Sequence, residues 1–208
     1  MNRAEIDKLE KQFRINFINS LGGFKSICLI GTQDQNQNHN LAIFSSIVHV
    51  GSNPPLFGFI SRPAAFERNT LENILETEYY TLNHINEAIF KQAHQTSARY
   101  DKGISEFEKT GLTAEYKNDF FAPFVQESFV QLGMKFRERI DIETNGTVLI
   151  IGEVLEVFYP KNCLLEDGFL DIEKAGTITC SGLDSYHKTL QLDRLSYAKP
   201  DKELTSIL

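Results

Sequence analysis

Residues 40–70, NLAIFSSIVHVGSNPPLFGFISRPAAFERNT, contain the pattern that decides the fold. Residues 41–50 are mostly apolar and rich in β-branched side chains, which favours a strand interrupted by a Ser-Ser pair. The Asn-Pro-Pro sequence at residues 53–55 must be a turn, because its second proline disfavours helical geometry at the first and neither proline can donate to a sheet. Residues 56–60 are therefore predicted to form a second strand.

The polar residues of this stretch provide what an anion site needs. Hydroxyls, positive charge and a helix N-terminus are supplied by Ser45, Ser46, Arg62, Arg68, Asn69 and Thr70. Thr70 is predicted to cap a short amphipathic helix. One interpretation is a site for a phosphate-bearing ligand. In the other interpretation the serines satisfy strand or turn backbone, the arginines are solvated, and Thr70 only caps its helix.

Together these segments resemble the flavin reductase-like family of FMN-binding split β-barrels, which includes the flavoredoxins. The resemblance begins with Asn-Leu-Ala-x-Phe-Ser-Ser, continues with Pro-Pro-Leu, and includes Arg-(x)6-Asn-Thr-(x)2-Asn-Ile. Similar segments follow at residues 76–83 (ETEYYTLN), 122–128 (APFVQES), 151–154 (IGEV) and 182–186 (GLDSY). They extend through nearly the whole chain, so a single flavin reductase-like FMN-binding domain at residues 1–208 is expected.

The resemblance implies bound FMN and a set of residues around it. These are Asn40, Leu41, Ala42, Ser45, Ser46, Ser61, Arg62, Arg68, Asn69, Thr70, Ser97, Ala98 and Arg99. The members up to Ser46 match family segments that run along the flavin, and those from Arg62 to Thr70 match its phosphate side. The last three belong to an insertion, residues 97–119, that is expected to fold over the isoalloxazine ring. Taken by itself, Arg99 is equally well a solvated loop arginine.

Patterning elsewhere predicts a mainly β fold. Residues 130–137 alternate between apolar and polar side chains, as in a strand with one solvated face. Asn145 and Gly146 are predicted to turn the chain into residues 147–158, a nearly continuous apolar run that suits a closed barrel or a dimer interface. The candidate strands, the short helices between them and the absence of an alternating βαβ pattern favour a β-barrel with inserted helices. The resemblance specifies an FMN-binding split barrel of Greek-key type.

Composition narrows the class of partner and the compartment. The chain has 21 Lys and Arg against 28 Asp and Glu, a net charge of −7 that argues against nucleic acid as a partner. Its three cysteines form no CxxC pair, so neither a disulfide framework nor a metal site is expected, and a reducing compartment is indicated. No apolar run approaches the length of a membrane span and the N-terminal segment is polar. A cytoplasmic protein without a membrane partner is therefore expected.

Both ends of the chain carry a structural prediction. Residues 2–13 are predicted to form an amphipathic helix whose apolar stripe, Ile6, Leu9 and Phe13, belongs to the core. Residues 196–208 are predicted to be a frayed tail. For Tyr186 and His187 the resemblance implies a place beside the flavin. The other interpretation is that Tyr186 packs at the mouth of the barrel and His187 is exposed.

No catalytic residue is identified from the sequence. Neither serine of the Ser-Ser pair lies in a GxSxG turn, and in a flavoprotein the hydride and electron chemistry resides in the cofactor. The resemblance implies a homodimeric FMN-dependent oxidoreductase that receives electrons from NAD(P)H or a reduced protein. Many relatives carry Gly-x-His where this chain has Asn145-Gly146-Thr147, so an FMN carrier or sensor without NAD(P)H turnover is the alternative. A third possibility is a split-barrel scaffold that has lost the cofactor.

Overall fold

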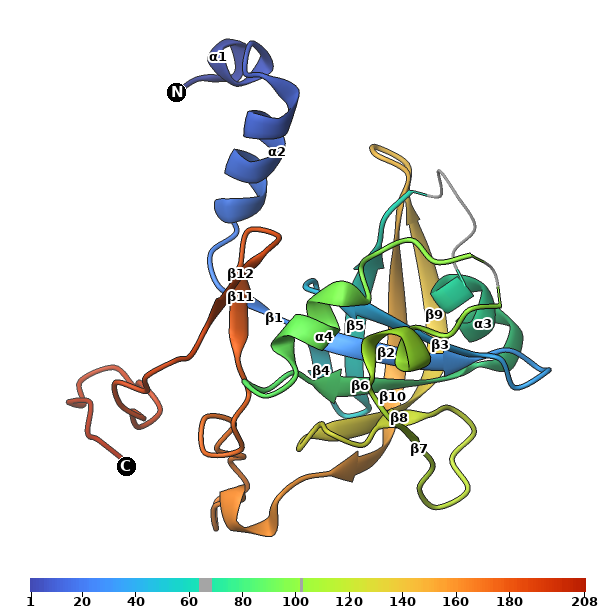
Figure 1. The fold of residues 1–208 in the computed structure, drawn as a ribbon. Helices are drawn as coiled ribbons and strands as arrows, with labels where there is room; N and C mark the ends of the chain where they lie inside the picture. The colour runs from blue at the N-terminus through green and yellow to red at the C-terminus, as the bar shows by residue number, and fades with distance from the viewer. Residues whose placement is uncertain (64–68, 102) are drawn as a thin grey trace.

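The computed structural model describes residues 1–63, 69–101 and 103–208 of the chain (Figure 1). Its centre is a seven-stranded sheet in which all neighbouring strands are antiparallel. In spatial order the strands are β3 (His39–Phe44), β2 (Cys28–Gln33), β6 (Tyr79–His84), β9 (Gln131–Ile142), β10 (Thr147–Phe158), β5 (Pro55–Ser61) and β4 (Val48–Ser52). The predicted mainly β class is confirmed, and the strands expected in residues 41–50 and 56–60 correspond to β3, β4 and β5.

Two small sheets and several short helices surround this sheet. One small sheet contains β1 (Lys25–Ser26), β11 (Thr179–Ser181) and β12 (Ser185–His187), and the other contains β7 (Ala114–Glu115) and β8 (Phe124–Val125). The helices are α1 (Arg3–Asp7), α2 (Lys11–Ser20), α3 (Asn69–Thr77), α4 (Phe90–Gln95), α5 (Glu106–Thr110) and the 3-10 turn η1 (Lys161–Cys163). No helix in the described parts of the chain is long and apolar enough to cross a membrane.

The large sheet curls around an apolar core to which most of its strands contribute. The fully buried members of this core are Ile30, Phe59, Tyr80, Met134 and Ile150, and α3 adds Ile74. In the residues that the structure describes, no ladder joins the edge strands β3 and β4. The barrel is therefore open between these two strands, and we call this opening the seam. Residues 45–47, which include the Ser-Ser pair, connect β3 to β4 across the seam.

The longest hairpin departs in one respect from the pattern read in the sequence. The turn predicted at Asn145 and Gly146 is confirmed, and Gly146 has the positive φ of 71° that glycine favours. One solvated face was predicted for the strand before it, but residues 131–134 are buried on both faces. The reason is tertiary, because a Cβ at Gly133 would lie 2.8 Å from the Phe120 ring, and Gln131 donates to the Val125 carbonyl at 2.6 Å.

The terminal segments differ from both predictions made for them. The single helix predicted at residues 2–13 is divided into α1 and α2. Its apolar stripe was expected in the core, yet α1 and α2 contain no buried residue and stand away from the barrel (Figure 1). The residues expected to fray instead form a defined turn back, in which Leu195 and Ser206 make an antiparallel bridge and Ile207 donates to the Arg194 carbonyl at 2.8 Å. Periodicity shows which face of a helix is apolar, but not what covers that face.

Candidate functional site

The Ser-Ser pair lies where the chain crosses the seam of the barrel. The Ser46 hydroxyl accepts from the Ile60 N–H at 3.0 Å and donates to the Ile60 carbonyl at 3.3 Å, which fixes the crossing segment to β5. The Ser46 hydroxyl thus forms hydrogen bonds with the backbone of a strand, which agrees with the second of the two interpretations given above. The Ser45 hydroxyl lies against the thiol of Cys180 in β11, so the seam is bordered by the small three-stranded sheet.

Ser61 and Arg62 follow directly on the β5 segment that Ser46 contacts. Ser61 is 2% exposed and lies opposite Val148 in β10. Arg62 is exposed, and no hydrogen bond or ion pair of its guanidinium is found within residues 1–63, 69–101 and 103–208. The predicted phosphate residue Arg68 lies outside the described residues. The hydroxyls of the seam and the Arg62 cation therefore occur at one end of the barrel.

Asn40 and Thr70 are brought together inside the molecule. The Asn40 amide donates to the Thr70 hydroxyl at 2.8 Å and to the Thr32 hydroxyl at 3.3 Å, and Asn73 donates to the same Thr32 oxygen at 3.1 Å. All four side chains are buried. The prediction that Thr70 caps its helix is wrong, because α3 begins one residue earlier, at Asn69. Buried amides and hydroxyls that satisfy one another fix β3 to α3.

A cavity of about 200 Å³ opens beside this network. Asn40 and Asn69 line it together with the carboxylates of Asp34, Glu72 and Glu76. Three carboxylates make this cavity unfavourable for a phosphate group, although a helix begins next to it. The part of the predicted set that suits an anion is therefore at Ser45 and Arg62, not at Asn69.

The insertion between residues 97 and 119 covers the free edge of β3. The Leu41 N–H, which points away from β2, donates to the Glu106 carboxylate at 2.9 Å. Burial raises the pKa of the Glu106 carboxyl, and the hydrogen bond from Leu41 opposes that rise. Ala42 pairs with Ile30 in β2. No sequence pattern points to Glu106, because the residue is 65 positions from Leu41 and lies in a polar insertion.

The last three predicted residues lie at the C-terminal end of α4 and are exposed. Ser97 donates to the His94 carbonyl at 2.7 Å, and the Ala98 N–H donates to the Gln95 carbonyl at 3.1 Å. Arg99 follows them on the surface. These contacts are those of a helix terminus, and they leave the outward side of this turn accessible.

The hairpin of β11 and β12 closes the other side of α4. Tyr186 is half-buried and its hydroxyl is 2.8 Å from His94 Nδ1. The interpretation that His187 is exposed is wrong, since its ring is half-buried and its Nε2 lies 2.9 Å from the Ser181 hydroxyl. Tyr186 also packs against Phe90, with ring centroids 5.4 Å apart.

Burial favours the protonated form of two thiols, those of Cys28 and Cys180. Cys28, Cys163 and Cys180 are all free and buried. Burial raises the pKa of Cys28 to about 12 and also raises the pKa of Cys180, although Lys25 and Ser45 pull the latter downward. The described residues contain no group of three or more His, Cys, Asp or Glu side chains that could hold a metal ion. A thiolate nucleophile is therefore not supported.

Comparison with known proteins identifies the family. A family profile described as a flavin reductase like domain matches residues 24–172, which is more than half of the chain. The chain belongs to the flavin reductase-like family. The match includes the seven-stranded sheet, the seam and the insertion, and it confirms the resemblance inferred from the sequence.

Solved structures of other proteins share the fold. A candidate flavin reductase with a split barrel domain from Shewanella frigidimarina is 51% identical, covers 95% of this chain and 98% of its own, and superposes with a TM-score of 0.92. Nitrilotriacetate monooxygenase component B from Bacillus cereus is 19% identical, with coverage of 94% and 97% and a TM-score of 0.81. Flavoredoxin of Desulfovibrio vulgaris is 22% identical, with coverage of 86% and 92% and a TM-score of 0.70. The last two show the fold alone, and the split-barrel prediction is confirmed.

Proposed function

We propose that this chain is an FMN-dependent oxidoreductase that takes electrons from NAD(P)H or a reduced protein and passes them to an acceptor. Membership of the flavin reductase-like family supports a flavin cofactor. The observation that carries the proposal is the seam of the barrel, where the crossing segment, the free edge of β3 and the exposed Arg62 adjoin. FMN, in preference to FAD, is favoured by the resemblance to FMN-binding split barrels.

The chemistry of the residues at the seam fits a phosphate-bearing flavin. Arg62 and the Ser45 hydroxyl would hold the phosphate, because a guanidinium and a hydroxyl supply charge-assisted hydrogen bonds to such a group. The outward edge of β3 would meet the acceptor edge of the ring once the Glu106 carboxylate, which accepts from the Leu41 N–H in this structure, is displaced. Leu41 and Ser45 are about 13 Å apart along an extended chain, so an elongated ligand can lie between these two places.

Each part of the predicted set would then have a separate role. The flavin supplies the hydride and electron transfer when bound. Ser46 would position the crossing segment through its two hydrogen bonds to Ile60. Asn40 and Thr70 would hold β3 against α3, and residues 97–99 would border the ring from the end of α4. We assign no general acid or base.

An FMN carrier or sensor is the second candidate, and one observation favours it. At the tip of the hairpin between β9 and β10, Asn145 accepts from the Thr147 N–H at 3.0 Å and from its hydroxyl at 2.7 Å. The Asn145-Gly146-Thr147 turn, which stands where many relatives carry Gly-x-His, is thus stabilised by its own side chains and contains no titratable side chain. A chain that binds FMN without a nicotinamide site would behave as a carrier.

We further propose that the chain is a homodimer in the cytoplasm. The outer face of β10, β5 and β4 carries apolar side chains that no other part of the described chain covers, and Val48, Val50 and Leu155 are each 45–48% exposed on it. Gly58 is flanked on this face by Leu149 and Val50. An apolar face on a sheet suits a two-fold contact with a second copy. Three buried free thiols agree with a reducing compartment.

The visible absorption spectrum tests this proposal. The purified protein is measured with and without added FMN and is then treated anaerobically with NADH and, separately, with NADPH. We expect flavin bands that bleach within seconds with one of the two nucleotides. Bands that persist with both nucleotides would favour the carrier or a protein donor, whereas a protein that takes up no FMN would refute flavin function.

A further inference from the structure

The N-terminal arm, residues 1–24, has no core of its own. Its longer helix, α2, has 10 residues and none of them is buried. Phe13, Leu21 and Phe24 are 57%, 63% and 70% exposed. An isolated helix of fewer than about 12 residues is marginal in water. A surface outside this chain must therefore cover the apolar side of the arm if α2 is to be stable.

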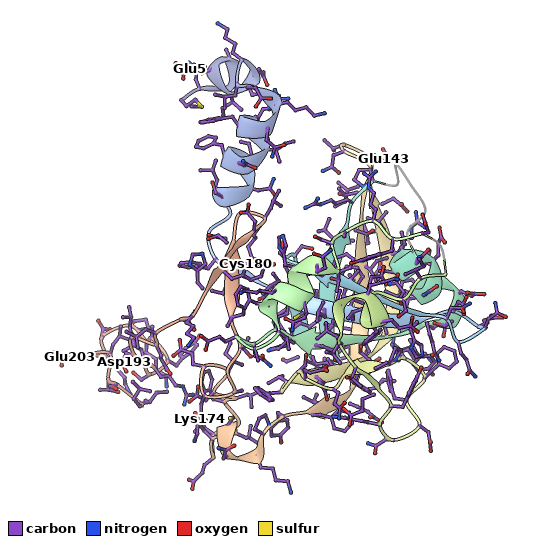
Figure 2. The ribbon with its side chains drawn as sticks, viewed as in Figure 1. Glu5, Glu143, Lys174, Cys180, Asp193 and Glu203 are labelled. Carbon is purple, nitrogen blue, oxygen red and sulfur yellow. The ribbon has the colours of Figure 1, made fainter. Side chains whose placement is uncertain are left out.

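The C-terminal arm, residues 189–208, has the same property. Its backbone is held by the antiparallel bridge of Leu195 with Ser206 and by the ion pair of Arg194 with Asp167 at 2.6 Å. Leu192 and Tyr197 are nevertheless 93% and 88% exposed. Figure 2 shows Glu5 near the tip of the N-terminal arm and Asp193 and Glu203 in the C-terminal arm, all away from the barrel.

The accessible surface of the chain is too large for a compact monomer. It measures 12,870 Å², whereas a compact chain of 23.7 kDa exposes about 9,800 Å². The difference is about 3,000 Å² per chain, or about 6,000 Å² for two copies, and obligate homodimers bury about 2,000–5,000 Å² or more in total over both partners.

The charge of the arms suits an acidic partner such as a second copy of this chain. The N-terminal arm has four basic and three acidic side chains, and the C-terminal arm has three of each. The other residues carry 14 Lys and Arg against 22 Asp and Glu, a net charge of −8. Arms that are neutral or slightly positive can lie on such a body without like-charge repulsion.

We infer that the two terminal arms dock on a second copy of this chain, each copy receiving the arms of the other. The exchange is reciprocal because a two-fold contact repeats every interaction. The arms would continue the apolar contact that begins at the outer face of β10, β5 and β4. This inference rests on the homodimer proposed above and adds to it that the arms are part of the interface.

Equilibrium sedimentation of full-length variants provides the first test. We compare Phe13→Glu in the N-terminal arm with Gln12→Glu, and Leu192→Glu in the C-terminal arm with Ala198→Glu, so that each pair introduces a carboxylate at neighbouring exposed positions. A central apolar contact is worth about 2 kcal/mol or more. We therefore expect the dimer dissociation constant to rise at least about tenfold in Phe13→Glu and Leu192→Glu and to change by less than about threefold in the controls.

Photo-cross-linking provides a second test that retains an aromatic side chain. Benzoylphenylalanine replaces Phe13, and in a separate variant it replaces Leu75, which is 39% exposed on α3, on the side of the barrel away from the arms (Figure 1). We expect a covalent dimer from the first variant and none from the second. A wild-type chain that sediments as a monomer would overturn both the homodimer and the docking of the arms.

A dimer that is insensitive to Phe13→Glu and Leu192→Glu, with cross-links only within one chain, would overturn the arm inference and leave the homodimer intact. Neither result depends on the flavin spectrum. Failure of the arm inference is therefore separate from failure of the proposed redox function.

Discussion

Replacement of Gly152 by alanine would measure how tightly the barrel is filled. Gly152 lies in β10 beside a bulge, and a Cβ there would overlap the Tyr80 hydroxyl and lie 2.9 Å from its Cζ atom. Tyr80 is fully buried, and its ring packs edge-on against Phe59 with centroids 5.9 Å apart. The Tyr80 hydroxyl has no hydrogen-bond partner among the residues that the structure describes. The ring therefore has no room to retreat, and its hydroxyl contributes no compensating contact.

Gly152→Ala and Tyr80→Phe should change the free energy of unfolding in opposite directions, and their effects should not be additive. Overpacking a filled core costs about 1–3 kcal/mol, and the overlap at Gly152 places Gly152→Ala near the upper end, at about 3 kcal/mol. Tyr80→Phe removes a buried, unpartnered hydroxyl and is expected to be stabilising by about 1 kcal/mol. In Gly152→Ala/Tyr80→Phe the most severe overlap is gone, so a coupling free energy of about 1 kcal/mol or more is expected.

Urea denaturation followed by far-UV circular dichroism provides the assay, since the chain has no tryptophan. All variants are compared at one protein concentration, because association contributes to apparent stability. Gly51→Ala is the control, since a Cβ there meets only the Pro54 carbonyl oxygen at 3.5 Å. A Gly152→Ala protein within about 0.5 kcal/mol of wild type, or additive effects in the double variant, would refute the reasoning.

Three further predictions concern titration and binding. Burial lowers the pKa of His84 to about 4. As the pH falls, the unfolded chain therefore binds the proton before the folded chain does, and the wild-type free energy of unfolding should fall by about 2 kcal/mol between pH 6.5 and 4, after allowance for the partly exposed ring. Urea midpoints of His84→Asn should lack this loss, and a parallel loss would contradict the assignment. Because burial raises the pKa of Glu106, wild type and Glu106→Gln should be equally stable at low pH, and wild type should become the less stable of the two as the pH rises through the raised pKa. A higher urea midpoint for wild type than for Glu106→Gln at pH 8 would contradict this prediction. Arg62→Ala should weaken FMN binding at least about tenfold in a fluorescence titration, while Arg139→Ala, which removes an exposed arginine paired with Asp141, should leave it unchanged.

Local patterns predicted the elements well where neighbouring residues decide them. The Asn-Gly turn before β10 and the Asn-Pro-Pro turn before β5 follow from backbone constraints at single residues, and the structure has both. The double burial of β9 was missed, because Phe120 covers Gly133 from a segment with no periodicity of its own. The single helix predicted at residues 2–13 is instead divided into α1 and α2, and the assignment of its apolar residues to the core was wrong.

Some residues of the candidate site were predicted from the sequence, whereas others are brought to the site only by packing. Ser45, Ser46 and Arg62 could be selected from the sequence because hydroxyls and a guanidinium are anion ligands wherever they occur. The acidic cavity beside Asn69 could not be foreseen, since its carboxylates come from residues 34, 72 and 76. Glu106 was missed for a related reason, because only the packing of α5 on β3 brings its carboxylate to the Leu41 N–H.

The family, the strands and turns of residues 40–61, and the net charge of −7 follow from the amino-acid sequence alone. These properties depend on residue types and short spacings, which are independent of the rest of the fold. Packing in three dimensions was needed to show that the Asn40 amide donates to Thr70, that Ser46 is hydrogen-bonded to Ile60, and that the terminal arms lie outside the barrel. Those outcomes depend on contacts between residues far apart in the chain, and such contacts form only when distant segments pack and exclude water together.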